Sequence, residues 1–209
     1  MITSLSVLAA YLLGSISFAI MASRLFGLPD PRTYGSGNPG ATNVLRSGKR
    51  AAALLTLAGD TAKGLVAVLL AHHFALLSAA GEAPVAAAGL AVLLGHLYPV
   101  YFRFQGGKGV ATAFGVMLGF SPMLALLAFM AFVIVAVVSR YVSLASVIAA
   151  TTAIVAAPLL LGWGIVTVAA LAVSLLVIWR HRANLQRLFA GTERRLSFGR
   201  RDAPRAGGG

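Results

Sequence analysis

The sequence predicts an all-α membrane protein that crosses the bilayer several times, because it is strongly apolar and its apolar residues are grouped. Of its 209 residues, 59% are hydrophobic and 11% are charged, and the mean hydropathy is +0.88. A soluble domain carries about a quarter charged residues. Most of the apolar segments reach or approach the ~20 residues that cross a bilayer. The seven segments are 4–26, 51–80, 84–102, 110–120, 122–139, 142–161 and 164–179.

Segments 4–26 and 110–120 each have an alternative interpretation. No basic residue precedes segment 4–26, so we interpret it as a spanning helix and not as a cleaved signal peptide. Segment 110–120 would extend only about 17 Å at ~1.5 Å per residue, a length typical of a half-helix or a re-entrant segment. The charge distribution decides in favour of a short crossing helix.

Lys and Arg are distributed as about seven crossings require. If all seven segments cross, three turns without Lys or Arg fall on one side of the membrane: 81–83, 119–121 and 161–163. The basic residues then gather on the other side, at 24–50, 103–108, 140 and 180–205. Cytoplasmic loops carry an excess of Lys and Arg. We therefore expect the N-terminus outside and the C-terminus in the cytoplasm.

Composition also bounds the domains and the chemistry. We expect one integral-membrane domain, 1–194, and a basic, Gly-rich tail, 195–209, whose composition is typical of disorder. The absence of Cys excludes disulfides and thiolate chemistry. The four His and five acidic residues show no ligand spacing, so we predict no metal and no cofactor. The net charge of +12 lies beside the apolar segments, which favours membrane lipids as partners and no nucleic acid.

A glycine-rich polar island, 35–40, precedes a helix-like run. Its glycines permit positive φ and close approach of a ligand, and Asn38 and Pro39 are predicted as the N-cap and the first helical residue. Free backbone amides with basic residues nearby favour an anion, above all phosphate. A plain interhelical turn is the alternative. The candidate phosphate-binding residues here are Ser36, Gly37, Asn38, Gly40, Thr42, Asn43 and Arg46.

A second island, Gly106, Gly107, Lys108 and Gly109, also opens a helix-like run. It is not a nucleotide P-loop, because the positions that need Gly and Ser or Thr hold Phe102 and Gly109. A lysine between glycines still holds a phosphate as a point charge. We therefore predict a second phosphate site.

One histidine, His96, precedes the second island, and another, His181, follows the last apolar segment. His96, near the end of its segment, is more typical of a hydrogen-bonded structural residue than of a base. His181 and Asn184 share a helical face. The arginines around them fit an amphipathic interfacial helix.

Polar residues in or beside other segments have two interpretations each. Asp60 and Lys63, at i and i+3 inside the second segment, either form a structural ion pair or belong to the site. Arg140 and Ser143 either form a basic turn or supply phosphate ligands.

Together these motifs resemble the membrane-integral bacterial glycerol-3-phosphate acyltransferases that use acyl phosphate, the PlsY family. Stretches 35–46, 95–112 and 181–193 carry the resemblance, which covers nearly everything but the tail. It implies transfer of a fatty acyl group from acyl phosphate to the 1-hydroxyl of sn-glycerol 3-phosphate. The products would be lysophosphatidic acid and phosphate, in the first acylation of phospholipid biosynthesis at the cytoplasmic face of the bacterial inner membrane. No His is followed five residues on by Asp, as the His-x4-Asp motif of acyl-CoA enzymes requires.

The resemblance also implies roles for the residues. Catalytic roles are expected for His181, Asn184, Lys108 and Arg46. Phosphate binding is expected of the residues named in the two islands and of Ser143. Supporting roles are expected for Asp60, Lys63, His96, Arg140 and Glu193. An enzyme that produces acyl phosphate is a candidate partner, and the oligomeric state is left open.

Other functions fit the sequence less well. A transporter or channel for organic phosphates predicts polar residues that continue to the outer face, where this chain is nearly free of charge. An alcohol phosphotransferase needs clustered metal-binding Asp, but Asp30 and Asp60 are isolated. A purely structural membrane protein leaves the three motifs unexplained.

Overall fold

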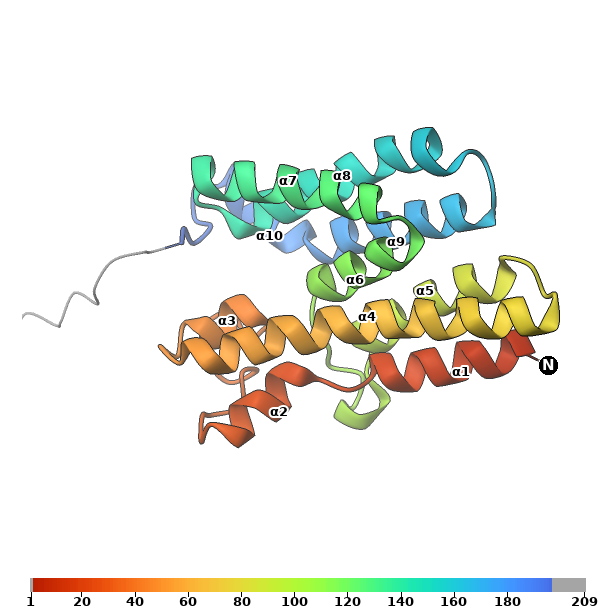
Figure 1. Cartoon of the computed structure of the whole chain (residues 1–209). Coiled ribbons are helices and arrows are strands. Elements are labelled where there is room, and N and C mark those ends of the chain that lie inside the picture. The colour runs from red at the N-terminus through yellow and green to blue at the C-terminus, as the bar shows by residue number, and fades with distance from the viewer. Residues whose placement is uncertain (1, 197–209) are drawn as a thin grey trace, which may run out of the picture.

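The computed structural model describes residues 2–196, and within them the chain forms helices and no strands. The long helices run side by side as a bundle (Figure 1). The α-helices are α1 Ile2–Gly14, α2 Phe18–Leu25, α3 Ala41–Leu45, α4 Arg50–Ser78, α5 Ala83–Leu97, α6 Val110–Phe120, α7 Pro122–Ser139, α8 Val142–Leu161, α9 Ile165–Arg180 and α10 Arg182–Phe189, and a 3-10 turn, η1, covers Val100–Phe102. The predicted all-α class is confirmed.

Several helices are long and apolar enough to cross a membrane. Within the described residues these are five, with α1 and α2 counted as one span, and six if α9 and α10, bent by 50°, also form one. The short α6 has 11 residues. The predicted limits 110–120, 122–139 and 142–161 coincide with α6, α7 and α8. A total of seven crossings stays a prediction.

The first apolar segment is interrupted, although one helix is expected over 4–26. The side chain of Lys63, on α4, donates hydrogen bonds to the backbone oxygens of Gly14 (2.9 Å) and Ile16 (2.7 Å). The helix restarts where the Ser17 hydroxyl accepts a hydrogen bond from the Ile20 amide (3.4 Å). Backbone groups at membrane depth need such partners. A lysine distant in sequence therefore stabilises the break.

Glycines bring α6 into backbone contact with α4. A Cβ on Gly64 would overlap the backbone oxygen of Thr112, and a Cβ on Gly115 would overlap the backbone oxygen of Thr61. Small residues permit this close packing of transmembrane helices. Because α6 is held in this way, the second glycine island at its N-terminus has a fixed position.

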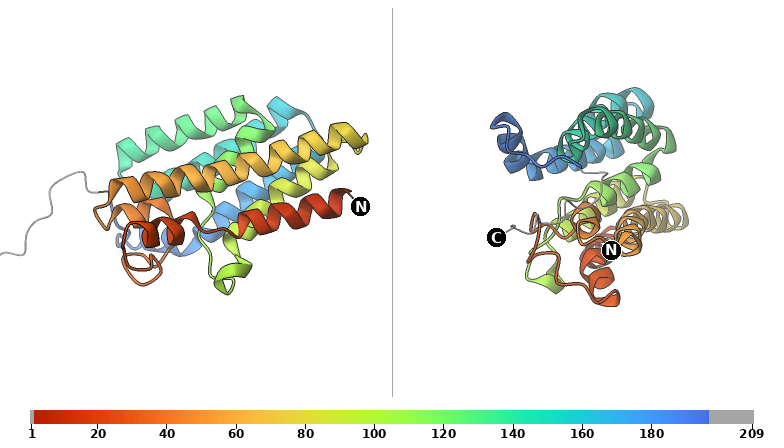
Figure 2. Two further views of the ribbon diagram at one scale, coloured as in Figure 1. Left: turned by 60° about the horizontal axis from the view of Figure 1, so that its bottom comes forward. Right: turned by 90° about the vertical axis from the view of Figure 1, so that its left-hand side faces the viewer.

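The two ends of the bundle differ in what they carry. The α4–α5 and α8–α9 turns lie at the end that holds the N-terminus, whereas α2, α3, the α7–α8 turn and α10 lie at the opposite end (Figure 1). The right-hand view of Figure 2 looks onto this opposite end. The turns at 81–83 and 161–163, which lack Lys and Arg, are thus separated from the basic segments.

Candidate functional site

The first glycine island folds around the side chain of Asn43, which is 2% exposed. The Asn43 amide nitrogen donates hydrogen bonds to the backbone oxygens of Pro31 (2.7 Å) and Tyr34 (3.1 Å). Its side-chain oxygen accepts one from the backbone amide of Ser36 (2.9 Å). Gly35 has φ +62°, and a Cβ there would overlap this same oxygen. The loop is therefore fixed before any ligand binds.

The helix after the first island begins later than the sequence predicts. Asn38 and Pro39 are not its N-cap and first residue, because α3 begins at Ala41 and its N-cap is Gly40. Gly40 is extended, with φ −157° and ψ 162°. Pro39 is buried, and its backbone oxygen faces Gly107 of the second island. This contact keeps the chain extended up to Gly40, so the predicted capping is wrong.

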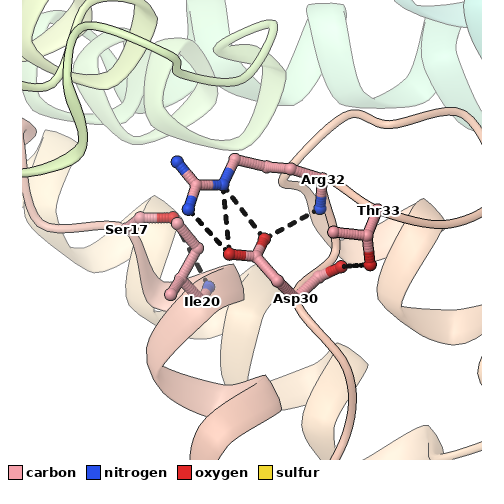
Figure 3. Close-up of polar contacts among 5 residues, drawn as sticks. All are labelled: Ser17, Ile20, Asp30, Arg32 and Thr33. Atoms are coloured by element: carbon pink, nitrogen blue, oxygen red, sulfur yellow. Dashed lines mark hydrogen bonds and ion pairs between the residues drawn. The ribbon is translucent and has the colours of Figure 1, made fainter.

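The loop that precedes the first island is closed by Asp30 and Arg32 (Figure 3). The Arg32 guanidinium donates hydrogen bonds to both carboxylate oxygens of Asp30, and these bonds lower the pKa of the Asp30 carboxyl. The Thr33 hydroxyl donates to the backbone oxygen of Asp30 (2.9 Å). The Arg32 guanidinium also lies 5.9 Å from the ring centroid of Phe102. The loop is thereby linked to η1.

The second island is held by His96 and Arg180. The backbone amide of Gly107 donates to the backbone oxygen of His96 (3.2 Å). The Arg180 guanidinium donates to the backbone oxygens of Gly107 (2.9 Å) and Gly106 (3.3 Å). A Cβ on Gly107 would overlap His96 Nε2 and would lie 3.0 Å from the backbone oxygen of Pro39. The two islands therefore meet at Pro39 and Gly107.

A chain of hydrogen bonds links Lys108 to the C-terminal motif. The Lys108 ammonium donates to the side-chain oxygen of Asn184, whose amide donates to Glu193 Oε1 (2.6 Å). Arg187 Nε donates to Glu193 Oε2 (2.8 Å). Burial opposes ionisation of Glu193, but the hydrogen bonds from Asn184 and Arg187 outweigh it and lower the carboxyl pKa. Burial also lowers the pKa of the Lys108 amine to about 8, so Lys108 is mainly protonated at pH 7.

His181 joins α9 to α10 and is 3% exposed. Its Nδ1 lies 2.8 Å from the backbone oxygen of Val177. A carbonyl oxygen only accepts hydrogen bonds, so Nδ1 carries the proton and Nε2 of the neutral ring keeps its lone pair. Burial lowers the pKa of His181 to about 4. The imidazole is therefore neutral at pH 7.

A buried polar cluster lies beneath the second island. Lys63 Nζ is 2.8 Å from Asp60 Oδ1, and both side chains are almost fully buried. His96 Nδ1 is 3.2 Å from the Thr112 hydroxyl and 3.5 Å from Asp60 Oδ1. The backbone of His96 in turn holds Gly107. The cluster thus connects the broken first span with the second island.

Both islands and the start of α10 line one cavity of about 290 Å3. Its lining residues are Ser36, Gly37, Asn38, Gly106, Lys108, Arg180, Arg182 and Ala183. Five of these were predicted as phosphate-binding residues. The structure therefore brings the two predicted phosphate sites into a single space that holds three cationic side chains.

Other predicted residues lie around this cavity without lining it. Arg46 donates a hydrogen bond to the side-chain oxygen of Asn43 (3.3 Å), and burial followed by the nearby Arg194 lowers its pKa. Ser143 is 7% exposed at the start of α8. Arg140 ends α7, and its backbone oxygen accepts a hydrogen bond from the Leu196 amide (2.7 Å). Gly107 also lies outside the lining, as do Thr42 on α3, Gly40 before it, and Gly109, the N-cap of α6 with φ +81°.

No site role was predicted from the sequence for the other three cavity residues, Arg180, Arg182 and Ala183. Basic residues at the end of an apolar segment have the same appearance whether they set topology or bind a ligand. Arg180 is distinguished only by its contacts with the second island, which no local pattern encodes. The predicted tail, 195–209, lies outside the described residues except for its first two positions.

Comparisons with known proteins all give the same family description. Residues 4–191 match the family model described as glycerol-3-phosphate acyltransferase. A protein of that name from Nitrosospira multiformis is 56% identical over 190 residues, 91% of this chain and 94% of the relative. One from Methylobacillus flagellatus is 57% identical over 187 residues, 90% of this chain and 93% of the relative.

Two crystal structures of PlsY, an integral membrane glycerol 3-phosphate acyltransferase, have the same fold. The glycerol 3-phosphate form superposes with a TM-score of 0.85 at 40% identity, over 93% of this chain and 96% of that one. The lysophosphatidic acid form gives a TM-score of 0.83 at 39% identity, over 93% and 95%.

Proposed function

The chain belongs to the glycerol-3-phosphate acyltransferase family, as an integral membrane enzyme of the PlsY type, and we propose that its acyl donor is acyl phosphate. In this proposal the acyl group passes to the 1-hydroxyl of sn-glycerol 3-phosphate. The products are lysophosphatidic acid and phosphate. The enzyme lies in the bacterial inner membrane with its site at the cytoplasmic face.

The observation that carries this proposal is the shared cavity. Two phosphorylated substrates bring up to about four negative charges together at neutral pH. Their repulsion would keep the hydroxyl away from the carbonyl carbon. Lys108, Arg180 and Arg182 line the cavity, and Arg46 lies close enough to act on Lys108 electrostatically. Fixed cations of this kind hold two anions in a reactive geometry, which supplies much of an enzyme's rate.

Direct transfer fits the chemistry of these substrates. The hydroxyl oxygen of glycerol 3-phosphate attacks the carbonyl carbon, and the bond from that carbon to the phosphate oxygen breaks. Phosphate is a good leaving group, so no covalent acyl-enzyme is required. A phosphate oxygen of the donor takes the hydroxyl proton, and the leaving group departs as hydrogen phosphate. Atoms and charge balance without a further reactant.

The environment of His181 supports the donor phosphate as the proton acceptor. A general base works best when its pKa is near the working pH, whereas burial lowers that of His181 to about 4. We assign to His181 and Asn184 the positioning of the reacting hydroxyl. Lys108 is held by Asn184 and places its charge on a substrate phosphate.

The positions of the termini and the lipid path follow from the same proposal. We place the basic end of the bundle, which carries α2, α3 and α10 (Figure 1), at the cytoplasmic side, because cytoplasmic loops hold an excess of Lys and Arg. The N-terminus then lies outside. The acyl chain of the donor lies between helices, against apolar side chains.

One experiment tests the donor. Purified protein in lipid receives labelled glycerol 3-phosphate with acyl phosphate, acyl-CoA or acyl carrier protein in parallel reactions, and Lys108→Ala and Arg46→Ala serve as inactive controls. The proposal predicts labelled lysophosphatidic acid from acyl phosphate alone. Product from acyl-CoA alone, or from none of the three donors, contradicts it.

A further inference from the structure

Three cationic side chains line the cavity, and they differ in their existing partners. Lys108 donates to Asn184. The Arg180 guanidinium donates to the backbone oxygens of Gly106 and Gly107, and it lies 5.6 Å from the ring centroid of Tyr98. In the part of the chain that the structure describes, none of the three forms an ion pair with a carboxylate. Arg182 differs from the other two because its hydrogen bond goes to its own neighbour Trp179 and not to an island or to Asn184.

Arg182 is nevertheless held in place by Trp179. Its guanidinium lies 4.4 Å from the centre of the Trp179 ring, the shortest of the cation–π contacts found among the described residues. Arg182 Nη1 also donates to the backbone oxygen of Trp179 (3.4 Å). Stacking on an indole leaves the edge of the guanidinium free to donate to a phosphate. The pair is preorganised for an anion.

The location of Trp179 indicates on which side of the cavity Arg182 lies. It lies in the last turn of α9, and 45% of its surface is exposed. The exposed face of a membrane helix contacts lipid, and tryptophan concentrates at the level of the headgroups. The Trp179–Arg182 pair is therefore placed where the cavity meets the membrane interface.

We infer that Arg182, held by Trp179, binds the phosphate of the membrane-borne acyl donor at the lipid side of the cavity, and that it does not bind glycerol 3-phosphate. The inference rests on the proposed function, since it assigns one of the two substrates to this position. A single-chain lipid phosphate has its phosphate at the headgroup level and its chain in the bilayer. Glycerol 3-phosphate arrives from water and needs no contact at the lipid interface.

A kinetic test separates the two substrates. Arg182→Gln is expected to raise the KM for acyl phosphate about tenfold, the effect of losing one charge-assisted hydrogen bond, and to leave the KM for glycerol 3-phosphate unchanged. Arg182→Lys should restore part of the loss, and Trp179→Leu should raise the donor KM less than Arg182→Gln. Arg195→Gln is the matched control, because Arg195 lies over the Tyr141 ring at 5.1 Å and does not line the cavity. An unchanged donor KM in Arg182→Gln, an equal rise for both substrates, or the same rise in Arg195→Gln overturns the inference.

A binding test needs no turnover. The chain has two tryptophans, and Trp163 is 81% exposed in the α8–α9 turn at the other end of the bundle. A Trp163→Phe variant therefore reports on Trp179 alone. Hexadecyl phosphate in mixed micelles is expected to change Trp179 emission to saturation, with at least tenfold weaker binding when Arg182→Gln is added, while hexadecanol gives no saturable change. Equal binding of hexadecyl phosphate with and without Arg182 overturns the inference.

The experiments distinguish a failure of the proposed acyl donor from a failure of the role inferred for Arg182. If the wild type makes no product from acyl phosphate but hexadecyl phosphate binds through Arg182, the donor assignment is wrong and the lipid phosphate site stands. If acyl phosphate is used and neither measurement responds to Arg182→Gln, the enzyme assignment stands and the role of Arg182 is refuted.

Discussion

The Lys108 ammonium donates a hydrogen bond to the side-chain oxygen of Asn184, a residue 76 positions later in the sequence. This bond joins the second glycine island to α10, and Asn184 passes the connection on to Glu193. The charge that we assign to a substrate phosphate is thereby oriented by a residue of a different motif.

Lys108 and Asn184 should act as a unit. Lys108→Ala and Asn184→Ala are each expected to lower kcat/KM by about two to three orders of magnitude, the usual effect of removing one preorganised electrostatic contact. Because each variant also disables the partner, the double variant should lose far less than the product of the two effects. Steady-state kinetics of the four proteins measure this coupling. Fully multiplicative losses would show that the two residues work independently.

The pH dependence should follow the Lys108 amine. Burial lowers its pKa to about 8, and the protonated form binds phosphate, so kcat/KM is expected to be constant near pH 7 and to fall as pH rises through about 8. Since kcat reports on the complex, where a bound phosphate favours the charged amine, its decline should begin at higher pH. Lys108→Arg should move the alkaline limb upward. A limb unchanged by this substitution contradicts the assignment.

His181→Gln tests the proton acceptor. The variant keeps a polar side chain near the reacting hydroxyl but cannot accept the proton as imidazole does, so most of the turnover should remain. Any change of kcat between pH 7 and pH 5 should be the same in the wild type and in His181→Gln, because burial lowers the pKa of His181 to about 4. Rate measurements with buffered acyl phosphate, corrected for its spontaneous hydrolysis, give both values. A loss of several orders of magnitude in His181→Gln would instead make His181 the general base.

Gly107→Ala should separate the two islands. The added Cβ would overlap His96 Nε2 and press on the backbone oxygen of Pro39. We expect at least a hundredfold lower kcat/KM, a loss typical of a misplacement of about 1 Å, in a protein that still folds. Gly164→Ala is the control, because a Cβ there has only Glu82 at 3.9 Å and Gly164 has an extended backbone. Wild-type activity of Gly107→Ala would show that the contact is not needed.

Most helix limits could be predicted from the sequence because local residues that cap or break a helix mark them. Ser121 and Pro122 separate α6 from α7, and Arg140 ends α7 in a left-handed conformation. The break after Gly14 was not predictable in this way. Serine is tolerated in transmembrane helices, and the break depends on Lys63, which reaches it from α4.

In the site, too, features encoded by local sequence were predicted and features that depend on tertiary contacts were not. Runs of glycine and polar residues reveal the two islands, since the apolar segments of this chain contain only single glycines. The meeting of Pro39 with Gly107 is a tertiary contact, so the sequence could not show that α3 starts only after Gly40. The lining by Arg182 also depends on the bend between α9 and α10, after which the start of α10 lines the same cavity as the second island.

A structure with both ligands bound tests the central claim most directly. The protein would be solved with glycerol 3-phosphate and an acyl phosphonate, in which a carbon that is not a leaving group replaces the bridging oxygen of the donor. We predict both phosphorus groups inside the cavity lined by Ser36, Lys108 and Arg182, with the 1-hydroxyl oxygen about 3–3.5 Å from the carbonyl carbon. Ligands bound at opposite ends of the bundle, or too far apart for the hydroxyl to reach the carbonyl, would contradict the account.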